Sequence, residues 1–177
     1  MTSMSGGVLS GREIQELVLS ETRLVADYMD LDSQVQPNGF DLTLEEVRRF
    51  TGRGSIAISN DERELPDLEA IAPDDGGYLE LPPGPFHITY RETVNIPKDL
   101  MAFGRPRSSL TRSGVSIHTA VWDAGYSGRS TSLMVVDNSL GFRVQIGARV
   151  AQLVFIRLSE ATAEGYSGIF QGENIKR

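Results

Sequence analysis

Residues 83–119 read PGPFHITYRETVNIPKDLMAFGRPRSSLTRSGVSIHT and carry the pattern that decides the fold. Within this stretch, apolar side chains alternate with other residues over 86–90, which is the two-residue period of a half-buried strand. An extended pattern continues over residues 94–96, and the prolines and glycine of 82–85 mark a turn before the first strand. The stretch therefore predicts short strands joined by tight turns.

The same pattern extends to both sides of this stretch. Further short strands are expected at residues 132–136, 142–146 and 150–156. Residues 42–50 fit either a strand or a helical turn. Ser10 with Glu13 has the spacing of a capping box and predicts a short helix over residues 11–19. Together these signals predict an all-β fold with one short N-terminal helix, a barrel or jelly roll without parallel crossovers.

Length and composition limit the class of protein. The chain has 177 residues, of which 40% are hydrophobic, so it can bury one sizeable core, and we expect a single domain over 1–177. Residues 52–80 are acidic and contain proline and glycine, which predicts an exposed insertion. The sequence has no apolar run of membrane-spanning length and no basic-then-apolar start, so we expect a cytoplasmic protein without membrane contact.

Cysteine and histidine usage narrows the chemistry further. With no cysteine, disulfides, thiolate nucleophiles and cysteine-ligated zinc are excluded, and His87 and His118 alone offer little for a histidine-built metal site. The net charge of −7 argues against nucleic-acid binding, which needs clustered Lys and Arg.

The charge is unevenly distributed along the chain. Residues 1–99 hold 8 Lys/Arg against 19 Asp/Glu, a net of −11, whereas residues 100–177 hold 9 against 5, a net of +4. A positive field within an acidic protein suits a small anionic ligand, although a chance asymmetry on a solvated surface explains the counts equally well.

The cationic half contains a cluster that fits a polyphosphate. Arg107, Ser108, Ser109 and Arg112 combine fixed cations with small hydroxyl donors at short spacing. Asp123 follows as a lone carboxylate that is suited to orienting a water molecule. Its simpler interpretation is a residue that opens a hairpin turn with Gly125.

Five motifs, in the expected order, resemble the dCTP deaminase and dUTPase superfamily. They are VLSGREIQELV at 8–18, NGFDL at 38–42, the 83–119 stretch with its Arg-Ser-Ser-Leu run, WDAGYSG at 122–128 and GARVAQLVF at 147–155. The resemblance is closest to the archaeal-type, dCTP deaminase-like dUTPases. It implies a distorted jelly-roll subunit that assembles into a homotrimer, with active sites shared between neighbouring chains.

The resemblance also implies the chemistry and its residues. In the dUTPases, water attacks the α-phosphorus of dUTP to give dUMP and pyrophosphate, with Mg²⁺ on the triphosphate. Asp123 matches the catalytic aspartate that orients this water, and Asp41 matches a carboxylate that reaches Mg²⁺ through water. The nucleotide-binding positions that the resemblance implies are Arg107, Ser108, Ser109, Arg112, Tyr126, Gly128, Arg149, Gln152, Tyr166 and Gln171.

Within that set, Tyr126 matches the aromatic residue that packs on deoxyribose and leaves no room for a 2′-hydroxyl. Arg149 and Gln152 belong to the motif near the phosphates. Tyr166 and Gln171 match nucleotide contacts in a C-terminal arm, residues 160–177, which is expected near the active site.

One carboxylate separates the two activities of the superfamily. The deaminases of this superfamily use a glutamate on the strand after the third motif, but here Ser132 to Val136 contain no glutamate. Zinc deaminases need a set of histidine or cysteine ligands, and this chain has no cysteine. The sequence therefore favours a dUTP diphosphatase. A dCTP deaminase or bifunctional enzyme, and a non-catalytic nucleotide-binding member, remain as alternatives, and the sequence does not separate dUTP from dTTP.

Overall fold

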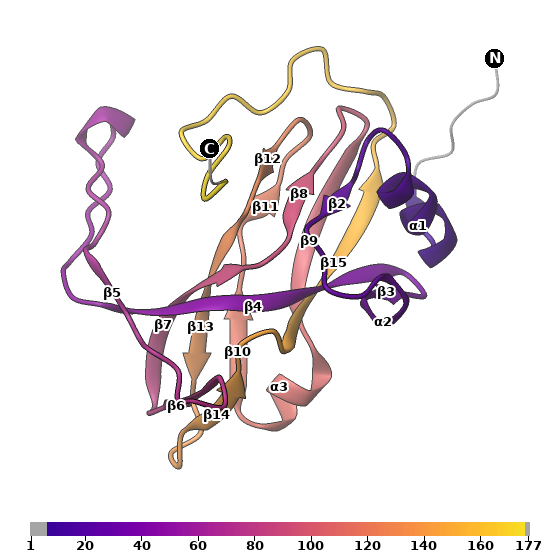
Figure 1. Ribbon diagram of the computed structural model, residues 1–177. Coiled ribbons are helices and arrows are strands. Elements are labelled where there is room, and N and C mark those ends of the chain that lie inside the picture. Colours follow the sequence, from indigo (N-terminus) through magenta and orange to yellow (C-terminus); the bar gives the residue numbers. More distant parts are fainter. Residues whose placement is uncertain (1–6, 176–177) are drawn as a thin grey trace.

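The computed structural model describes residues 7–175 and consists mainly of antiparallel strands (Figure 1). The main sheet has ten strands, seven of which follow the order β10-β13-β7-β4-β15-β9-β11. In that order these strands span Val115–His118, Thr131–Val136, Gly84–Tyr90, Gly39–Phe50, Arg149–Arg157, Leu100–Pro106 and Val121–Trp122. The three remaining strands, β1 (Gly7–Val8), β3 (Val35–Gln36) and β5 (Leu68–Ala70), pair with β15 or β4. The expected mainly-β class is confirmed.

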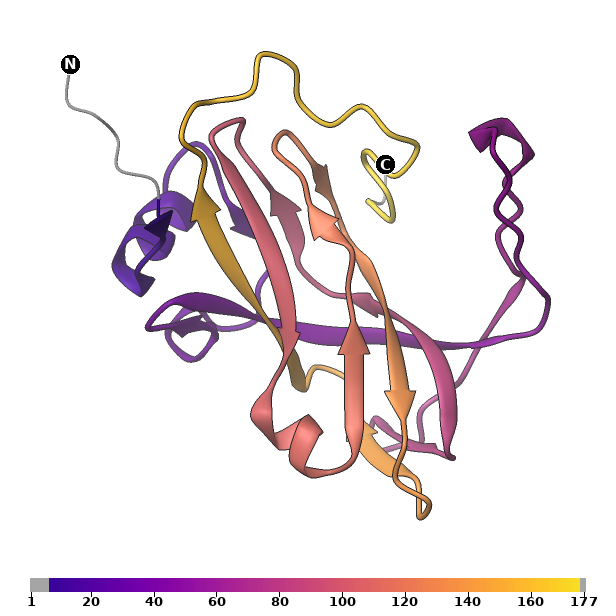
Figure 2. The same ribbon diagram turned by 180° about the vertical axis from the view of Figure 1, so that it is seen from behind.

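Strand β4 curls this sheet into a half-barrel. Its first part, Phe40 to Thr43, pairs with β15, and its second part, Leu44 to Arg48, pairs with β7. Each pairing contains a register irregularity, in β15 between Arg149 and Ala151 and in β4 between Leu44 and Glu46. Figures 1 and 2 show β4 crossing the other long strands. Residues 42–50, for which the sequence left strand and helix open, are therefore strand.

Two small sheets complete the framework. One joins β12 (Ser127–Gly128), β8 (Thr93–Asn95) and β2 (Val25–Ala26), and the other joins β14 (Phe142–Gln145) and β6 (Tyr78–Leu81). The strands expected from the sequence are present within a residue or two of their expected ends.

The N-terminal helix α1 (Gly11–Leu19) is confirmed together with its capping box. The Ser10 amide donates to the Glu13 carboxylate at 2.9 Å, and the Glu13 amide donates back to Ser10 Oγ at 3.4 Å. Ile14 and Val18 are the buried residues of this helix and pack into the core. The predicted period of apolar residues is therefore the face by which α1 covers the sheet.

The expectation of a single helix was wrong, because two short helices lie in connections between strands. Helix α2 (Leu31–Gln34) is capped by Asp30, whose carboxylate accepts from the Ser33 amide at 3.2 Å. Helix α3 (Ser108–Arg112) begins two residues after Pro106, where β9 ends, and Arg107 is its N-cap residue. Such helices of four or five residues are too short to leave an apolar period in the sequence.

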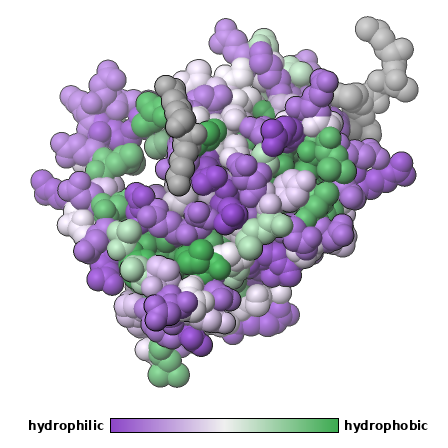
Figure 3. All heavy atoms as spheres, in the orientation of Figure 1, coloured by the Kyte–Doolittle hydropathy of each residue, from purple (hydrophilic) through white to green (hydrophobic). Residues whose placement is uncertain are grey.

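Residues 52–66 project from the sheet as a narrow hairpin (Figures 1 and 2). Ser55 pairs with Glu64, a single 3₁₀ turn η1 (Asn60–Glu62) forms the tip, and the Ile58 side chain is fully exposed. Within residues 52–80, which the sequence analysis expected to be an exposed insertion, Leu79 of β6 is 1% exposed and belongs to the core. Figure 3 shows that hydrophilic residues prevail on this face of the molecule, with smaller hydrophobic areas between them. In residues 7–175, no helix is both long and apolar enough to cross a membrane.

A buried glutamate, Glu92, which the sequence analysis did not single out, anchors β4. It is fully buried and accepts hydrogen bonds from the Thr43 amide at 2.9 Å, the Thr43 hydroxyl at 2.7 Å and Gln34 Nε2 at 2.7 Å. Gln34 Nε2 also donates to the Asp41 carbonyl at 2.9 Å. Burial raises the pKa of Glu92, and these hydrogen bonds oppose that shift. Glu92 thus fixes the segment of β4 that carries Asp41.

We expect Glu92→Ala to lower the free energy of unfolding by about 3 kcal/mol or more, because three buried donors lose their acceptor. Urea denaturation measures this loss, with exposed Glu21→Ala as the matched control. A loss no larger than that of the control would show that water takes over the role of the carboxylate.

Candidate functional site

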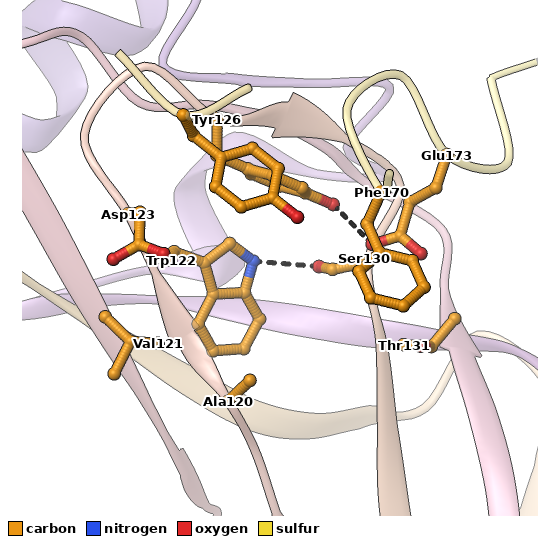
Figure 4. A pocket seen from close by; sticks show the side chains of 10 residues that line it. Ala120, Val121, Trp122, Asp123, Tyr126, Ser130, Thr131, Phe170 and Glu173 are labelled. Atoms are coloured by element: carbon orange, nitrogen blue, oxygen red, sulfur yellow. Dashed lines mark hydrogen bonds between the residues drawn. The ribbon is translucent and has the colours of Figure 1, made fainter. Parts of the chain in front are cut away.

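A cavity of about 250 Å³ lies beside β11, beneath the C-terminal tail (Figure 4). Three segments supply its walls: residues 120–126, the start of β13 at 130–131, and the tail at 166–173. We call it the aromatic pocket and define it by Trp122, Asp123, Tyr126, Tyr166, Phe170 and Glu173. It brings the predicted Asp123, Tyr126 and Tyr166 together.

A tight turn places Asp123 and Tyr126 on the wall of this pocket. The Asp123 carbonyl accepts from the Tyr126 amide at 3.1 Å, and Gly125 between them has φ +87°, where a side chain is strained. A Cβ on Gly125 would also lie 2.6 Å from Gly165 Cα in the tail. The turn expected from the sequence is present, and it holds Asp123 exposed at the pocket while Tyr126 is buried.

Aromatic side chains and one tail carboxylate form the rest of the pocket. The Tyr126 and Tyr166 rings meet edge to face at 5.8 Å, and Trp122 Nε1 donates to Ser130 Oγ at 2.9 Å. The Tyr126 hydroxyl donates to Glu173 Oε1 at 2.9 Å. Burial raises the pKa of Tyr126, and Glu173 raises it further, because a neighbouring carboxylate disfavours a phenolate.

Gln171, which the sequence analysis expected at the nucleotide, fastens the tail to the Asp123 turn. Its side-chain oxygen accepts from the Ser127 amide at 3.0 Å, and its nitrogen donates to the Gly125 carbonyl at 3.0 Å. Gly128 lies against the Tyr126 hydroxyl, which a Cβ would approach to 2.5 Å. Both residues therefore position the pocket wall in this structure.

A second cavity, of about 700 Å³, lies where β9 runs into α3. We call it the arginine cleft and define it by Asp41, Arg107, Ser108, Thr111, Arg112 and Gln152. Most of the predicted phosphate-binding residues therefore lie together. Ser109 is exposed on α3 and does not line the cleft.

The buried carboxylate of Asp41 pairs with two arginines at the cleft. It is 1% exposed, and its Oδ2 lies 3.0 Å from Arg107 Nε and 3.4 Å from Arg149 Nη1. Arg149 also donates to the Ser33 carbonyl. Burial raises the pKa of Asp41, whereas the two guanidinium groups lower it. Because the arginines are about one-third exposed, they keep donors free for a ligand.

The aromatic pocket and the arginine cleft have no lining residue in common. In Figure 1, α3 beside the cleft lies at the bottom, whereas β11 and the tail lie near the top. Most of the residues that the sequence assigned to one site thus fall into two separate sets within the chain, while Ser109, Gly128, Arg149 and Gln171 line neither cavity.

Comparison with known proteins identifies the family of this chain. The family model described as DCD, dCTP deaminase-like, matches residues 8–158. The chain belongs to the dCTP deaminase-like family. A relative from Archaeoglobus fulgidus is 49% identical over 95% of this chain and 98% of its own, and one from Methanosarcina acetivorans is 44% identical over 96% and 99%. Both bear the name "Probable deoxyuridine 5'-triphosphate nucleotidohydrolase".

A solved structure supports the fold. The 2′-deoxycytidine 5′-triphosphate deaminase from Agrobacterium tumefaciens superposes with a TM-score of 0.64, covering 86% of this chain and 49% of that one. At 23% identity this likeness concerns the fold alone.

As a dCTP deaminase-like protein, the chain has few acidic groups at the aromatic pocket. Asp123 and Glu173 are the carboxylates that line it among residues 7–175, and β13 contributes none. The sequence analysis did not predict Glu173 as a site residue, because a glutamate in a polar tail has no distinguishing pattern. Burial raises its pKa, and the hydrogen bond from Tyr126 opposes this.

We expect Gln171→Ala to free the tail without unfolding the barrel, because it removes two hydrogen bonds that fasten residues after 158 to the turn. Limited proteolysis followed by mass spectrometry should show tail cleavage about five-fold faster or more, at an unchanged melting temperature. Glu164→Ala, an exposed change in the same tail, is the control. Equal cleavage rates for the two variants would contradict a fastening role for Gln171.

Proposed function

We propose that the protein is a dUTP diphosphatase that converts dUTP to dUMP and pyrophosphate. The observation that carries this proposal is similarity over nearly the full length to relatives named as dUTP nucleotidohydrolases, at 42–49% identity. The two sets of residues in the fold supply the parts that this reaction needs.

The arginine cleft is suited to the triphosphate. Arg107 and Arg112 are fixed cations, and Ser108 adds a hydroxyl donor in the same cleft. Guanidinium groups bind phosphate oxygens in a bidentate manner, and their charge offsets the charge that develops on the leaving pyrophosphate. Asp41 carries a single negative charge, which Arg107 and Arg149 share through the same oxygen. It therefore holds Arg107 in place without neutralising all the cations of the cleft.

The aromatic pocket supplies the nucleophile side of the reaction. Asp123 is exposed on a turn that glycine geometry fixes, so its carboxylate is free to hold and orient a water molecule that attacks the α-phosphorus. Tyr126 in the same pocket packs against the deoxyribose. The pocket is enclosed by the tail, which limits the access of other water molecules to the reacting phosphate.

The residues present fit a magnesium ion that arrives on the nucleotide. Asp41 lines the cleft, and its Oδ1 is buried without a hydrogen-bond partner among the described residues, so a metal-bound water could donate to it. No group of three metal-ligating side chains exists within residues 7–175. Magnesium bound mainly by phosphate oxygens and waters needs no such group. When bound, it supplies positive charge to the triphosphate.

The separation of the two sets supports a site built from two chains. A nucleotide must contact phosphate-binding and nucleoside-binding groups at once, but within one subunit these lie at different ends of the sheet. We infer a homotrimer in which the arginine cleft of one subunit faces the aromatic pocket of its neighbour.

Deamination of dCTP is the second candidate, and Glu173 is the observation in its favour, because it is a carboxyl group inside the aromatic pocket. Scoring ammonia from dCTP beside pyrophosphate from dUTP separates the two activities. Tight nucleotide binding without either product would support a non-catalytic member of the family.

We expect Asp123→Asn to lower kcat for pyrophosphate release from dUTP by about 10²- to 10⁴-fold, since the amide no longer accepts the proton of the attacking water. The fold should be retained because the side chain is exposed. Asp137→Asn, an exposed change in the turn after β13, is the matched control. Full activity of the Asp123 variant would assign the water to another group.

A mixing experiment tests the shared site. Asp123→Asn changes the aromatic pocket, and Arg112→Ala changes the arginine cleft. Because the proposed reaction needs both cavities, each variant alone should be inactive. When equal amounts are unfolded and refolded together, about one quarter of the sites should combine an intact Asp123 with an intact Arg112 from another chain. Recovery of pyrophosphate release is the measurement. No recovery above the separately refolded variants would show that each site lies within one subunit.

A further inference from the structure

The aromatic pocket has a chemical character of its own, which the reaction proposed above does not fully use. Its lining contains the two carboxylates of Asp123 and Glu173 and no Lys or Arg. A phosphate group would be repelled here, whereas a flat neutral ring can stack on the aromatic walls. Its volume, about 250 Å³, lies just below the roughly 300–1,000 Å³ of usual ligand pockets, as expected for part of a ligand. The pocket therefore suits the nucleoside end of a nucleotide.

The two carboxylates mark opposite ends of this pocket. Figure 4 shows Asp123 at one side and Glu173 at the other, with Trp122 between them. If Asp123 orients the water at the α-phosphorus, the sugar lies over Tyr126, and the base extends away from the phosphate. The group that the base then meets is Glu173, at the hydroxyl end of the Tyr126 ring.

The Glu173 carboxylate retains capacity for a ligand. Among the described residues it accepts one hydrogen bond, from the Tyr126 hydroxyl to Oε1 at 2.9 Å. An ionised carboxylate has two acceptor oxygens with about four lone-pair sites and donates nothing. In a half-buried, largely aromatic pocket, a remaining acceptor is best matched by an N–H group.

We propose that Glu173 reads the base of the nucleotide by accepting the N3–H of uracil. This inference rests on the proposed dUTP reaction and adds the residue that selects its base. Uracil carries its single ring N–H on this edge, whereas cytosine carries a lone pair at N3, and its one donor group on this edge is the exocyclic N4 amino group. A carboxylate held opposite N3 therefore meets a donor in uracil and an acceptor in cytosine. Such a mismatch leaves two acceptors unpaired, which is the kind of contact that discriminates strongly between ligands.

The position of Glu173 on the tail gives this contact a structural basis. The tail is fastened on both sides of it, by Gln171 to the Asp123 turn and by Asn174 Nδ2 to the Arg129 carbonyl at 2.9 Å. Burial raises the pKa of Glu173, and the hydrogen bond that Tyr126 donates acts against this shift by favouring the ionised, accepting form of the carboxylate. Glu173 is therefore held at the pocket as an acceptor.

The test pairs a change in the protein with a change in the ligand. Titration calorimetry measures the binding of α,β-imido-dUTP and its N3-methyl derivative to the full chain and to Glu173→Ala, with Glu164→Ala as control. The unchanged protein should bind the methylated ligand at least about ten-fold more weakly, and Glu173→Ala should reduce that ratio to about three-fold or less. The control should keep the full ratio.

The outcomes separate this inference from the proposed reaction. If Glu173→Ala keeps the full ratio, or weakens both ligands equally, the carboxylate does not read N3–H and the inference is overturned. Glu173→Gln provides a second variant of the same shape, whose amide can also pair with cytosine. It should therefore raise the affinity for α,β-imido-dCTP about ten-fold relative to the dUTP analogue. Pyrophosphate release from dUTP by the unchanged protein tests the reaction itself, independently of these ratios.

Discussion

The ion pairs between the buried Asp41 and two partly exposed arginines are the interaction on which the arginine cleft depends. A carboxylate that is 1% exposed is costly unless cations and hydrogen bonds compensate it, and here the cations are Arg107, between β9 and α3, and Arg149, at the start of β15. The Asp41 backbone is itself held by Gln34, which Glu92 orients. A chain of polar contacts thus runs from the buried Glu92 to the arginines of the cleft.

The division of charge between the two cavities follows from this arrangement. The arginine cleft keeps donors free because one carboxylate cannot neutralise all its cations, whereas the aromatic pocket contains carboxylates and rings without a cation. A nucleoside triphosphate has the same division, with a polyanion at one end and a flat neutral base at the other. The chain is acidic overall but net positive in its second half, so its local rather than its total charge suits such a ligand.

The sequence predicted those features that leave a local pattern. Alternating apolar residues predicted the strands, the capping box predicted α1, and the Asp123 turn was expected from its glycine. The polar interior was not predictable, because Glu92 and Gln34 look like surface residues until the fold brings them 2.7 Å apart across 58 positions of the chain. The division of the site into two cavities was not predictable from the sequence either. Arg112 and Asp123 are close in sequence, but in the fold they line different cavities.

The location of the acidic group in the aromatic pocket bears on whether it transfers protons or selects the base. A side chain on β13 has a direction fixed by the sheet, and there the buried positions are Ser132, Met134 and Val136. Glu173 instead belongs to the tail, where its carboxylate accepts from the Tyr126 hydroxyl and its backbone carbonyl accepts from the Arg129 amide at 2.9 Å. Base recognition asks of this carboxylate only that it accept a hydrogen bond, whereas deamination asks it to take up and release protons during the reaction. A tail carboxylate that is already bound to a phenol hydroxyl is therefore better suited to recognising uracil than to deaminating cytosine, in agreement with a diphosphatase built on the fold of a deaminase.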